Sequence, residues 1–190
     1  MIRIRGKMHK SEQRTREISG AIEPIGLIHT PFKHADGTPV QGIAGKRAEG
    51  IVEVLPDLIE GLRDLEGFDR LWLIYLFNHA SEAQLVVRPY LDTTERGVFA
   101  TRSPVRPNHI GISVVRLLHI EQNRLYVADV DMLDGTPLLD IKPYVPHYDY
   151  YPVQRCGWLD TVPDKPLVAD DRFERPDART AAESLPSQAI

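Results

Sequence analysis

The feature that most constrains the fold is a series of short segments rich in β-branched and aromatic residues, separated by turn-forming residues. Few stretches show the three-to-four-residue period of an amphipathic helix. Many short strands at near-regular spacing are typical of an all-β sandwich or barrel. The expected strands are 22–30, 50–55, 71–77, 85–91, 97–101, 110–120, 125–130 and 138–141.

The segment 71–77 reads LWLIYLF and is apolar throughout. Such a run predicts a strand buried on both faces, or a barrel strand packed against a partner. One short helix is expected at 57–62, because Pro56 favours the first turn and Asp57 suits its positive end. Residues 33–49 form a long loop, and long loops inside compact domains are often functional.

The 190 residues suit one domain at 20–159, preceded by a loose basic arm at 1–19 and followed by a tail at 160–190. The formal net charge of −4 creates no global attraction to nucleic acid, so any such contact must use local patches. The lone Cys156 cannot form an internal disulfide, which fits a reducing compartment. No apolar stretch is long enough to span a membrane, and we expect a cytoplasmic protein.

A loop rich in proline and arginine at 96–111 is the first segment that carries chemistry. Its arginines are Arg96, Arg102 and Arg106, with Ser103 and Asn108 as neutral hydrogen-bonding groups. Prolines stiffen the loop, and guanidinium groups match carboxylates or phosphates with two parallel hydrogen bonds. The loop therefore predicts an anion-binding or ligand-binding site, and a salt-bridged surface loop is the alternative.

An acidic segment lies next at 127–137. Asp129 and Asp131 are two residues apart, so on a strand they would face the same side. The spacing does not match a calcium-binding loop, and no metal site is expected. A carboxylate facing a cationic ligand is the functional interpretation, and turn capping is the alternative.

His79 and His109 are the candidate acid–base residues, because imidazole titrates near neutral pH. Neither position has geometric support from the sequence, and the catalytic residue stays unknown. No glycine-rich GxGxxG segment follows an expected strand, so a Rossmann-type nucleotide site has no support.

Four motifs resemble the TsaA/TrmO-like (YaeB/VirR-type) family. They read IGLIHTPF from residue 25, LEGFDRLW from residue 65, GVFATRSPVRPN from residue 97 and DGTPLLDIKPYVP from residue 134. The resemblance covers roughly residues 22–148. It implies a mainly β fold, a small antiparallel β-barrel with short peripheral helices, unlike the Rossmann sheet of most methyltransferases.

The resemblance further implies a homodimer that binds S-adenosylmethionine and methylates N6 of threonylcarbamoyladenosine at position 37 of tRNA. The residues carried over by motif as cofactor-binding are Pro39, Gln41, Asn78, His79, Arg102, Ile112, Asp129, Val130 and Asp131. Those expected to contact substrate RNA are Arg96, Arg106 and Asn108.

The chain departs from the family pattern at three positions near this site. Val40 stands where the tRNA methylases commonly have Arg, Asn78 where they have His, and His109 where they have Pro. These differences favour an alternative, a methyltransferase of the same fold that acts on another RNA or on a small molecule. A non-catalytic module that binds S-adenosylmethionine or RNA is the third hypothesis.

Overall fold

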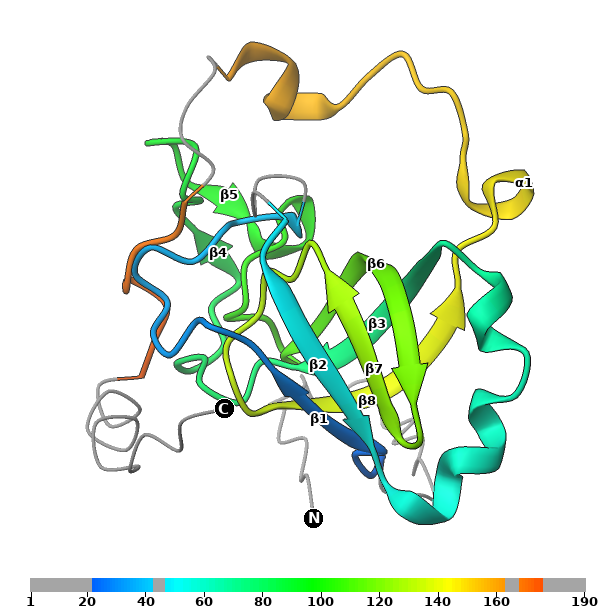
Figure 1. Cartoon of the computed structure of the whole chain (residues 1–190). Helices are drawn as coiled ribbons and strands as arrows, with labels where there is room; N and C mark the ends of the chain where they lie inside the picture. Colours follow the sequence, from blue (N-terminus) through cyan, green and yellow to red (C-terminus); the bar gives the residue numbers. More distant parts are fainter. Residues whose placement is uncertain (1–21, 43–46, 163–167, 176–190) are drawn as a thin grey trace, which may run out of the picture.

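The computed structural model describes residues 22–42, 47–162 and 168–175, and its centre is a closed six-stranded barrel (Figure 1). Every neighbouring pair of barrel strands is antiparallel, in the order β1-β2-β7-β6-β3-β8, and β8 pairs back with β1. The mainly β fold and the barrel are therefore confirmed. The strands are β1 (Gly26–His29), β2 (Glu49–Val54), β3 (Arg70–Leu76), β6 (Ile110–Glu121), β7 (Arg124–Ala128) and β8 (Thr136–Pro143).

The core fills the inside of the barrel with aliphatic side chains. Along β3, the side chains of Leu71, Leu73 and Tyr75 are buried, whereas those between them are only partly covered. A closed barrel requires this alternation, because successive residues of a strand point inward and outward. Burial on both faces of 71–77 was therefore the wrong option. The barrel strand is confirmed, whereas its packing against a partner stays a prediction.

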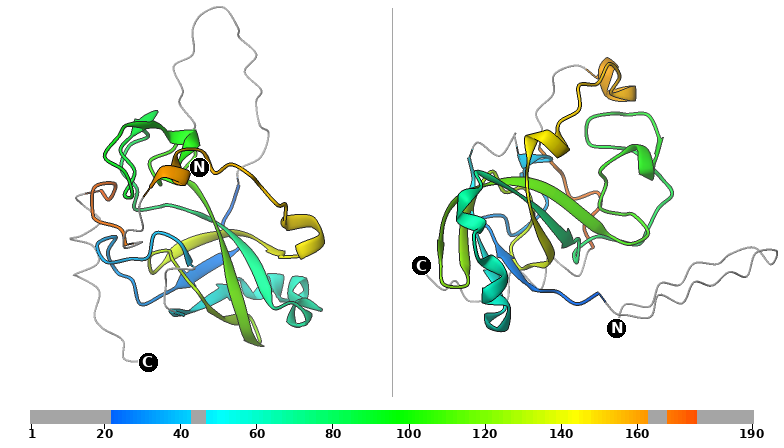
Figure 2. Two further views of the ribbon diagram at one scale, coloured as in Figure 1. Left: turned by 90° about the horizontal axis from the view of Figure 1, so that it is seen from above. Right: turned by 90° about the vertical axis from the view of Figure 1, so that its right-hand side faces the viewer.

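A second apolar cluster lies outside the barrel, in the long excursion from Phe77 to His109 that projects from one barrel end (Figure 2). The excursion contains a two-stranded ribbon of β4 (Val86–Val87) and β5 (Arg96–Gly97) and the 3₁₀ turn η4 (Val98–Ala100). Its cluster gathers Ala80, Val87, Val98 and Val105 around Phe173, which comes from the far end of the described chain.

The strand expected at 97–101 is the clearest local error. The backbone turns there, because the Thr101 amide and hydroxyl both donate to the Val98 carbonyl oxygen. A β-branched composition predicted a strand, but local hydrogen bonds from a threonine compete with strand pairing. The strand expected at 85–91 is likewise reduced to β4.

Short helical segments lie outside the barrel. η2 (Pro56–Leu62) and η3 (Leu65–Gly67) connect β2 to β3 at the end opposite the excursion, where we expected one short helix. After β8, α1 (Pro146–Asp149) and η5 (Gly157–Thr161) lie on a segment that arches back toward the excursion (Figure 1). Within the described residues, no helix is long and apolar enough to cross a membrane. The expected arm at 1–19 lies outside these residues.

Residues 168–175, part of the expected tail, pack against the barrel end. Val168 bridges to Pro39, and Glu174 bridges to Ala80. The Ser81 amide donates to the Phe173 carbonyl oxygen. This strap, as we call residues 168–175, therefore ties the early loop to the start of the excursion.

Candidate functional site

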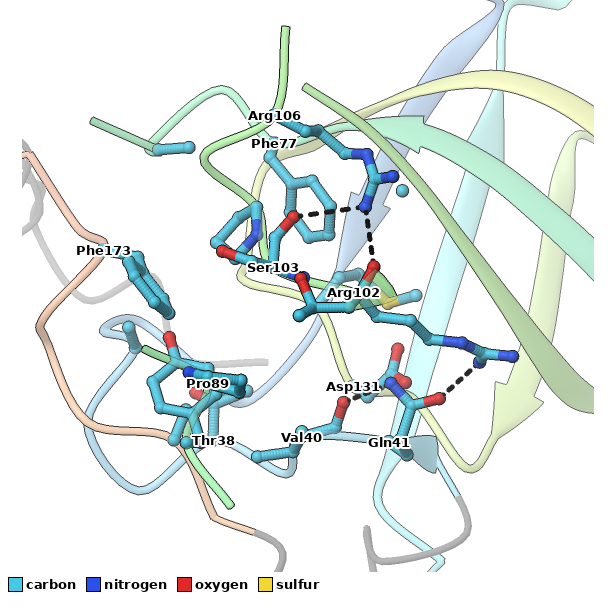
Figure 3. Close-up of a pocket in the computed structure, with 18 of the residues that line it drawn as sticks. Thr38, Val40, Gln41, Phe77, Pro89, Arg102, Ser103, Arg106, Asp131 and Phe173 are labelled. Carbon is cyan, nitrogen blue, oxygen red and sulfur yellow. Dashed lines mark hydrogen bonds between the residues drawn. The ribbon is translucent and has the colours of Figure 1, made fainter. Parts of the chain in front are cut away.

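A pocket of about 1080 Å³ opens at the barrel end that carries the excursion (Figure 3). Its walls come from the early loop after β1, the ends of β3 and β6, the loop rich in proline and arginine, and the strap. Seven of the nine residues predicted to bind cofactor line it, together with two of the three predicted RNA contacts. The first group is Pro39, Gln41, Asn78, His79, Arg102, Ile112 and Asp131, and the second is Arg106 and Asn108.

Arg102 joins two of the predicted segments directly. Its guanidinium donates to the side-chain oxygen of Gln41, 61 residues away in sequence. Figure 3 shows this pair on one side of the pocket with Asp131, and Phe173, Pro89 and Thr38 on the other. The arginine-bearing loop and the aspartate-bearing segment therefore meet at one cavity.

Arg106 braces the loop that carries Arg102. Its Nη1 lies 3.3 Å from the Thr101 carbonyl oxygen and 3.4 Å from that of Ser103. The Ser103 hydroxyl is buried at the pocket wall and has no hydrogen-bond partner among the described residues. Because a buried hydroxyl without a partner is costly, this oxygen is available to a ligand.

A chain of three hydrogen-bonded side chains links two residues of the pocket wall, Tyr75 and Asp131, through Ser113. Tyr75 Oη lies 3.1 Å from Ser113 Oγ, and Ser113 Oγ donates to Asp131 Oδ1 at 2.6 Å. Burial raises the pKa of Tyr75 above its ordinary value, so it keeps its proton and donates to Ser113. Burial also raises the pKa of Asp131 to about 6, although Ser113, the Gly42 amide and Arg102 each favour its charged form.

Two glycines make this arrangement sterically possible. A Cβ on Gly111 would lie 2.2 Å from the Tyr75 ring. The ring can therefore pack against β6 only because residue 111 has no side chain. A Cβ on Gly42 would lie 2.3 Å from the Asp129 carbonyl oxygen. The early loop therefore approaches the end of β7 closely enough for the Gly42 amide to reach Asp131.

Asp129 and Val130 do not line this pocket, although the motif placed them in the cofactor set. β7 ends at Ala128, and Asp129 has a left-handed backbone with φ of 69°. The turn breaks the strand alternation, so Asp129 accepts from Arg70 at 3.2 Å while Asp131 bonds Ser113. Our expectation that both aspartates face one side is wrong for this reason. Val130 is fully buried in the barrel core.

Arg96 and His109 are also not among the residues that line the pocket. Arg96 donates twice to Asp92 Oδ2, at 3.0 and 2.7 Å, and its Cζ lies 5.5 Å from the Trp158 ring centroid. The Nε2 atom of His109 lies 3.1 Å from the Ser81 carbonyl oxygen. Since a carbonyl only accepts, Nε2 carries the proton there. His79 is the histidine candidate that does line the pocket.

Several wall residues escaped the sequence reasoning. Tyr75 was interpreted only as part of an apolar strand, and Trp158 and Phe173 lie beyond the motifs that carried the resemblance. No local pattern marks these positions, because contacts distant in sequence bring them to the wall. Among residues 22–42, 47–162 and 168–175, no group of three His, Cys, Asp or Glu side chains is placed to hold a metal ion.

Comparison with known proteins agrees with this geometry. A family model described as "tRNA-methyltransferase O N-terminal domain" matches residues 27–150. A Pyrococcus abyssi protein named "Probable S-adenosyl-L-methionine-binding protein" is 55% identical over 137 residues, covering 72% of this chain and 74% of its own. The mouse tRNA (adenine(37)-N6)-methyltransferase is 37% identical over 134 residues, covering 67% of this chain and 31% of its own.

A crystal structure of TrmO from Pseudomonas aeruginosa superimposes with a TM-score of 0.64 at 40% identity, covering 77% of this chain and 64% of that one. The matched part thus spans less than two thirds of that protein and about a third of the mouse enzyme. The barrel, the pocket at its end and these matches lead to one conclusion: the chain belongs to the family of the tRNA-methyltransferase O N-terminal domain.

Proposed function

We propose that this protein is an S-adenosylmethionine-dependent methyltransferase whose acceptor is N6 of a modified adenosine at position 37 of tRNA. The observation that carries the proposal is the pocket in which Gln41, Asn78, Arg102 and Asp131 meet. These residues come from four separate segments of the chain. Relatives named for S-adenosylmethionine binding and for tRNA adenine methylation support the same function.

The residues present fit the methyl donor chemically. Arg102 offers a cation for its carboxylate, and Ser103 offers a buried hydroxyl that has no partner among the described residues. Phe77, Ile110 and Ile112 supply apolar surface for a nucleoside. When bound, the donor supplies a methyl group on a sulfonium centre.

The pocket lies at the upper end of the usual size for a small-molecule site. Such sites measure about 300–1,000 Å³, and this pocket measures about 1080 Å³. A methyltransferase must hold donor and acceptor together, because in-line transfer depends on their alignment. Arg106 and Asn108 on the same wall are the groups we assign to the acceptor.

Nucleoside mass spectrometry tests the function. The protein is incubated with tRNA that carries threonylcarbamoyladenosine without its methyl group, and with S-adenosylmethionine labelled on the methyl group. The digested nucleosides are then analysed, and label on threonylcarbamoyladenosine is the expected result. Label on a different acceptor would favour the second hypothesis, for which the apolar Val40 at the pocket wall is the supporting observation. Cofactor binding without any turnover would contradict both.

Arg102→Ala tests the cofactor site directly. Loss of a charge-assisted hydrogen bond of about 1.5–3 kcal/mol should weaken S-adenosylmethionine binding by about 10- to 150-fold. Isothermal titration calorimetry measures this change. Arg63→Ala is the matched control, because Arg63 pairs with Glu60 on η2, away from the pocket. Equal affinities for the two variants would remove Arg102 from the site.

A further inference from the structure

We propose that the Asp131 carboxylate, held by Ser113 and Tyr75, is the proton acceptor for the methyl-accepting nitrogen. This inference rests on the proposed function and assigns a base for which the sequence offered only two candidate histidines. Its basis is the placement of the Asp131 carboxylate on the pocket wall, in a hydrogen-bonded chain with Ser113 and Tyr75.

The direction of the hydrogen bonds leaves Asp131 able to accept a proton. An ionised carboxylate only accepts, so Ser113 Oγ must donate to it and must in turn accept from Tyr75. The Gly42 amide donates to the same carboxylate. The Asp131 backbone amide donates as well, so these three donors leave one of the carboxylate's about four lone-pair positions.

Among the described residues, two titratable or charged groups interact with Asp131, and they come from different elements. Tyr75 on β3 stays protonated, and Arg102 on the loop rich in proline and arginine favours the carboxylate form. Desolvation opposes these effects and is the largest of them. The result is a carboxylate that is charged at neutral pH yet more basic than one in water, which suits a general base.

The chemical step balances with this assignment. A neutral N–H acceptor is a poor nucleophile while it keeps its proton. The Asp131 carboxylate takes that proton, and the N–H electron pair stays on nitrogen to form the new N–C bond. The S–C bond breaks with its electron pair retained by sulfur, so the sulfonium charge is lost as the carboxylate becomes neutral.

The histidines fit this role less well. His109 uses Nε2 to reach the Ser81 carbonyl oxygen and is not among the residues that line the pocket. His79 lines the pocket, so it remains the alternative that the experiment must separate from Asp131.

The experiment compares wild-type protein with Asp131→Asn, Ser113→Ala and His79→Gln. Asp36→Asn is the matched control, because Asp36 is an exposed carboxylate of the early loop that does not line the pocket. Single-turnover transfer to tRNA is measured from about pH 5 to about pH 9, a range that brackets the ordinary titration of a histidine. The affinity for S-adenosylhomocysteine is measured by calorimetry on each variant.

The wild-type rate should rise with pH to a plateau, with the midpoint of the rise near pH 6, since the base form of Asp131 is required. Asp131→Asn should lower the plateau about 10²- to 10⁴-fold and abolish the rise, with product-cofactor affinity within about threefold. Ser113→Ala should move the midpoint upward, because it removes a donor to the charged form. Asp36→Asn should match wild type.

A readout without turnover completes the test. In protein with ¹³C-labelled aspartate and no ligand, one carboxyl resonance should titrate near pH 6 and disappear in Asp131→Asn. Full activity of Asp131→Asn, or loss of the pH-dependent rise only in His79→Gln, would overturn the inference alone. Loss of product-cofactor binding in Asp131→Asn would also overturn it, by making Asp131 a ligand-binding group. Absence of transfer by the wild type would instead overturn the proposed function.

Discussion

At the scale of single residues, the site places a carboxyl group where burial makes its charged form less favourable than in water. Asp131 is partly buried, and its pKa is raised to about 6 from an ordinary value of 3.8, chiefly by this burial. The folded protein therefore binds a proton on Asp131 more tightly than the unfolded chain does. Stability conferred by this proton is fully present below about pH 4 and is lost as the pH rises through about 6.

The stability of Asp131→Asn relative to wild type should therefore increase as the pH rises. Relative to wild type, its free energy of unfolding should increase by about 1–3 kcal/mol between about pH 4 and about pH 8, since one pKa unit corresponds to about 1.4 kcal/mol. Urea unfolding of both proteins at the two pH values measures this difference. Asp36→Asn is the control, and a pH-independent difference for Asp131→Asn would contradict the expected titration.

At the scale of elements, the strap at 168–175 lies outside the family match yet contributes to the pocket. The Gly37 amide donates to the Ala169 carbonyl oxygen, and the Ala169 amide donates to that of Thr38. The Arg175 amide donates to the His79 carbonyl oxygen. The strap thereby connects the two loops that carry Pro39 and His79.

Phe173→Ala should loosen this connection. Phe173 is 5% exposed and stacks edge-on against Tyr90 with ring centroids 5.1 Å apart. Truncation of a buried Phe costs about 3–5 kcal/mol of stability. Here this loss should mainly make local opening of the strap more frequent. Hydrogen exchange at the Ala169 and Ser81 amides should accelerate, and cofactor affinity should fall.

Tyr148→Ala is the matched control for this prediction, since Tyr148 is an aromatic residue that is 73% exposed. It should leave exchange at the strap amides unchanged. Unaltered exchange and affinity in Phe173→Ala would show that the strap does not hold the pocket.

At the scale of the whole molecule, large apolar side chains are exposed on the arching segment after β8 and on the excursion. Their exposed fractions exceed two thirds, and they are Leu85, Phe99, Tyr148, Tyr150, Tyr151 and Val153. Figure 1 shows that the arch stands away from the barrel between α1 and η5. Exposed apolar groups in such numbers favour a protein partner, and we expect a second copy of the chain.

Light scattering after size exclusion should therefore give twice the 21.5 kDa of the chain. Tyr150→Ser combined with Tyr151→Ser should shift the mass toward the monomer, because it removes apolar surface from the arch. Tyr126→Ser is the control, since Tyr126 stacks on His119 on the barrel wall. A monomer at all concentrations for the wild type would contradict the expected homodimer.

Particular residues show how far sequence patterns extend. The β-branched composition of 110–120 and the turn-forming residues around it predicted β6 almost to its ends. The same logic failed at 97–101, where the Thr101 hydroxyl competes with strand pairing. For the site, the family resemblance pointed to Gln41, Arg102 and Asp131, all of which line the pocket.

The sequence by itself determined the strand-rich character, the family and nine of the pocket-lining residues, because side-chain alternation and ordered motifs are local properties of the chain. Only the tertiary structure separated Asp129 from Asp131, since a left-handed residue at a strand end turns the next residues away from the direction that strand alternation predicts. Only the closed barrel joined Tyr75 and Ser113 to Asp131, and only long-range packing brought Phe173 to the same pocket. These contacts depend on distances across the fold, which no pattern of neighbouring residues encodes.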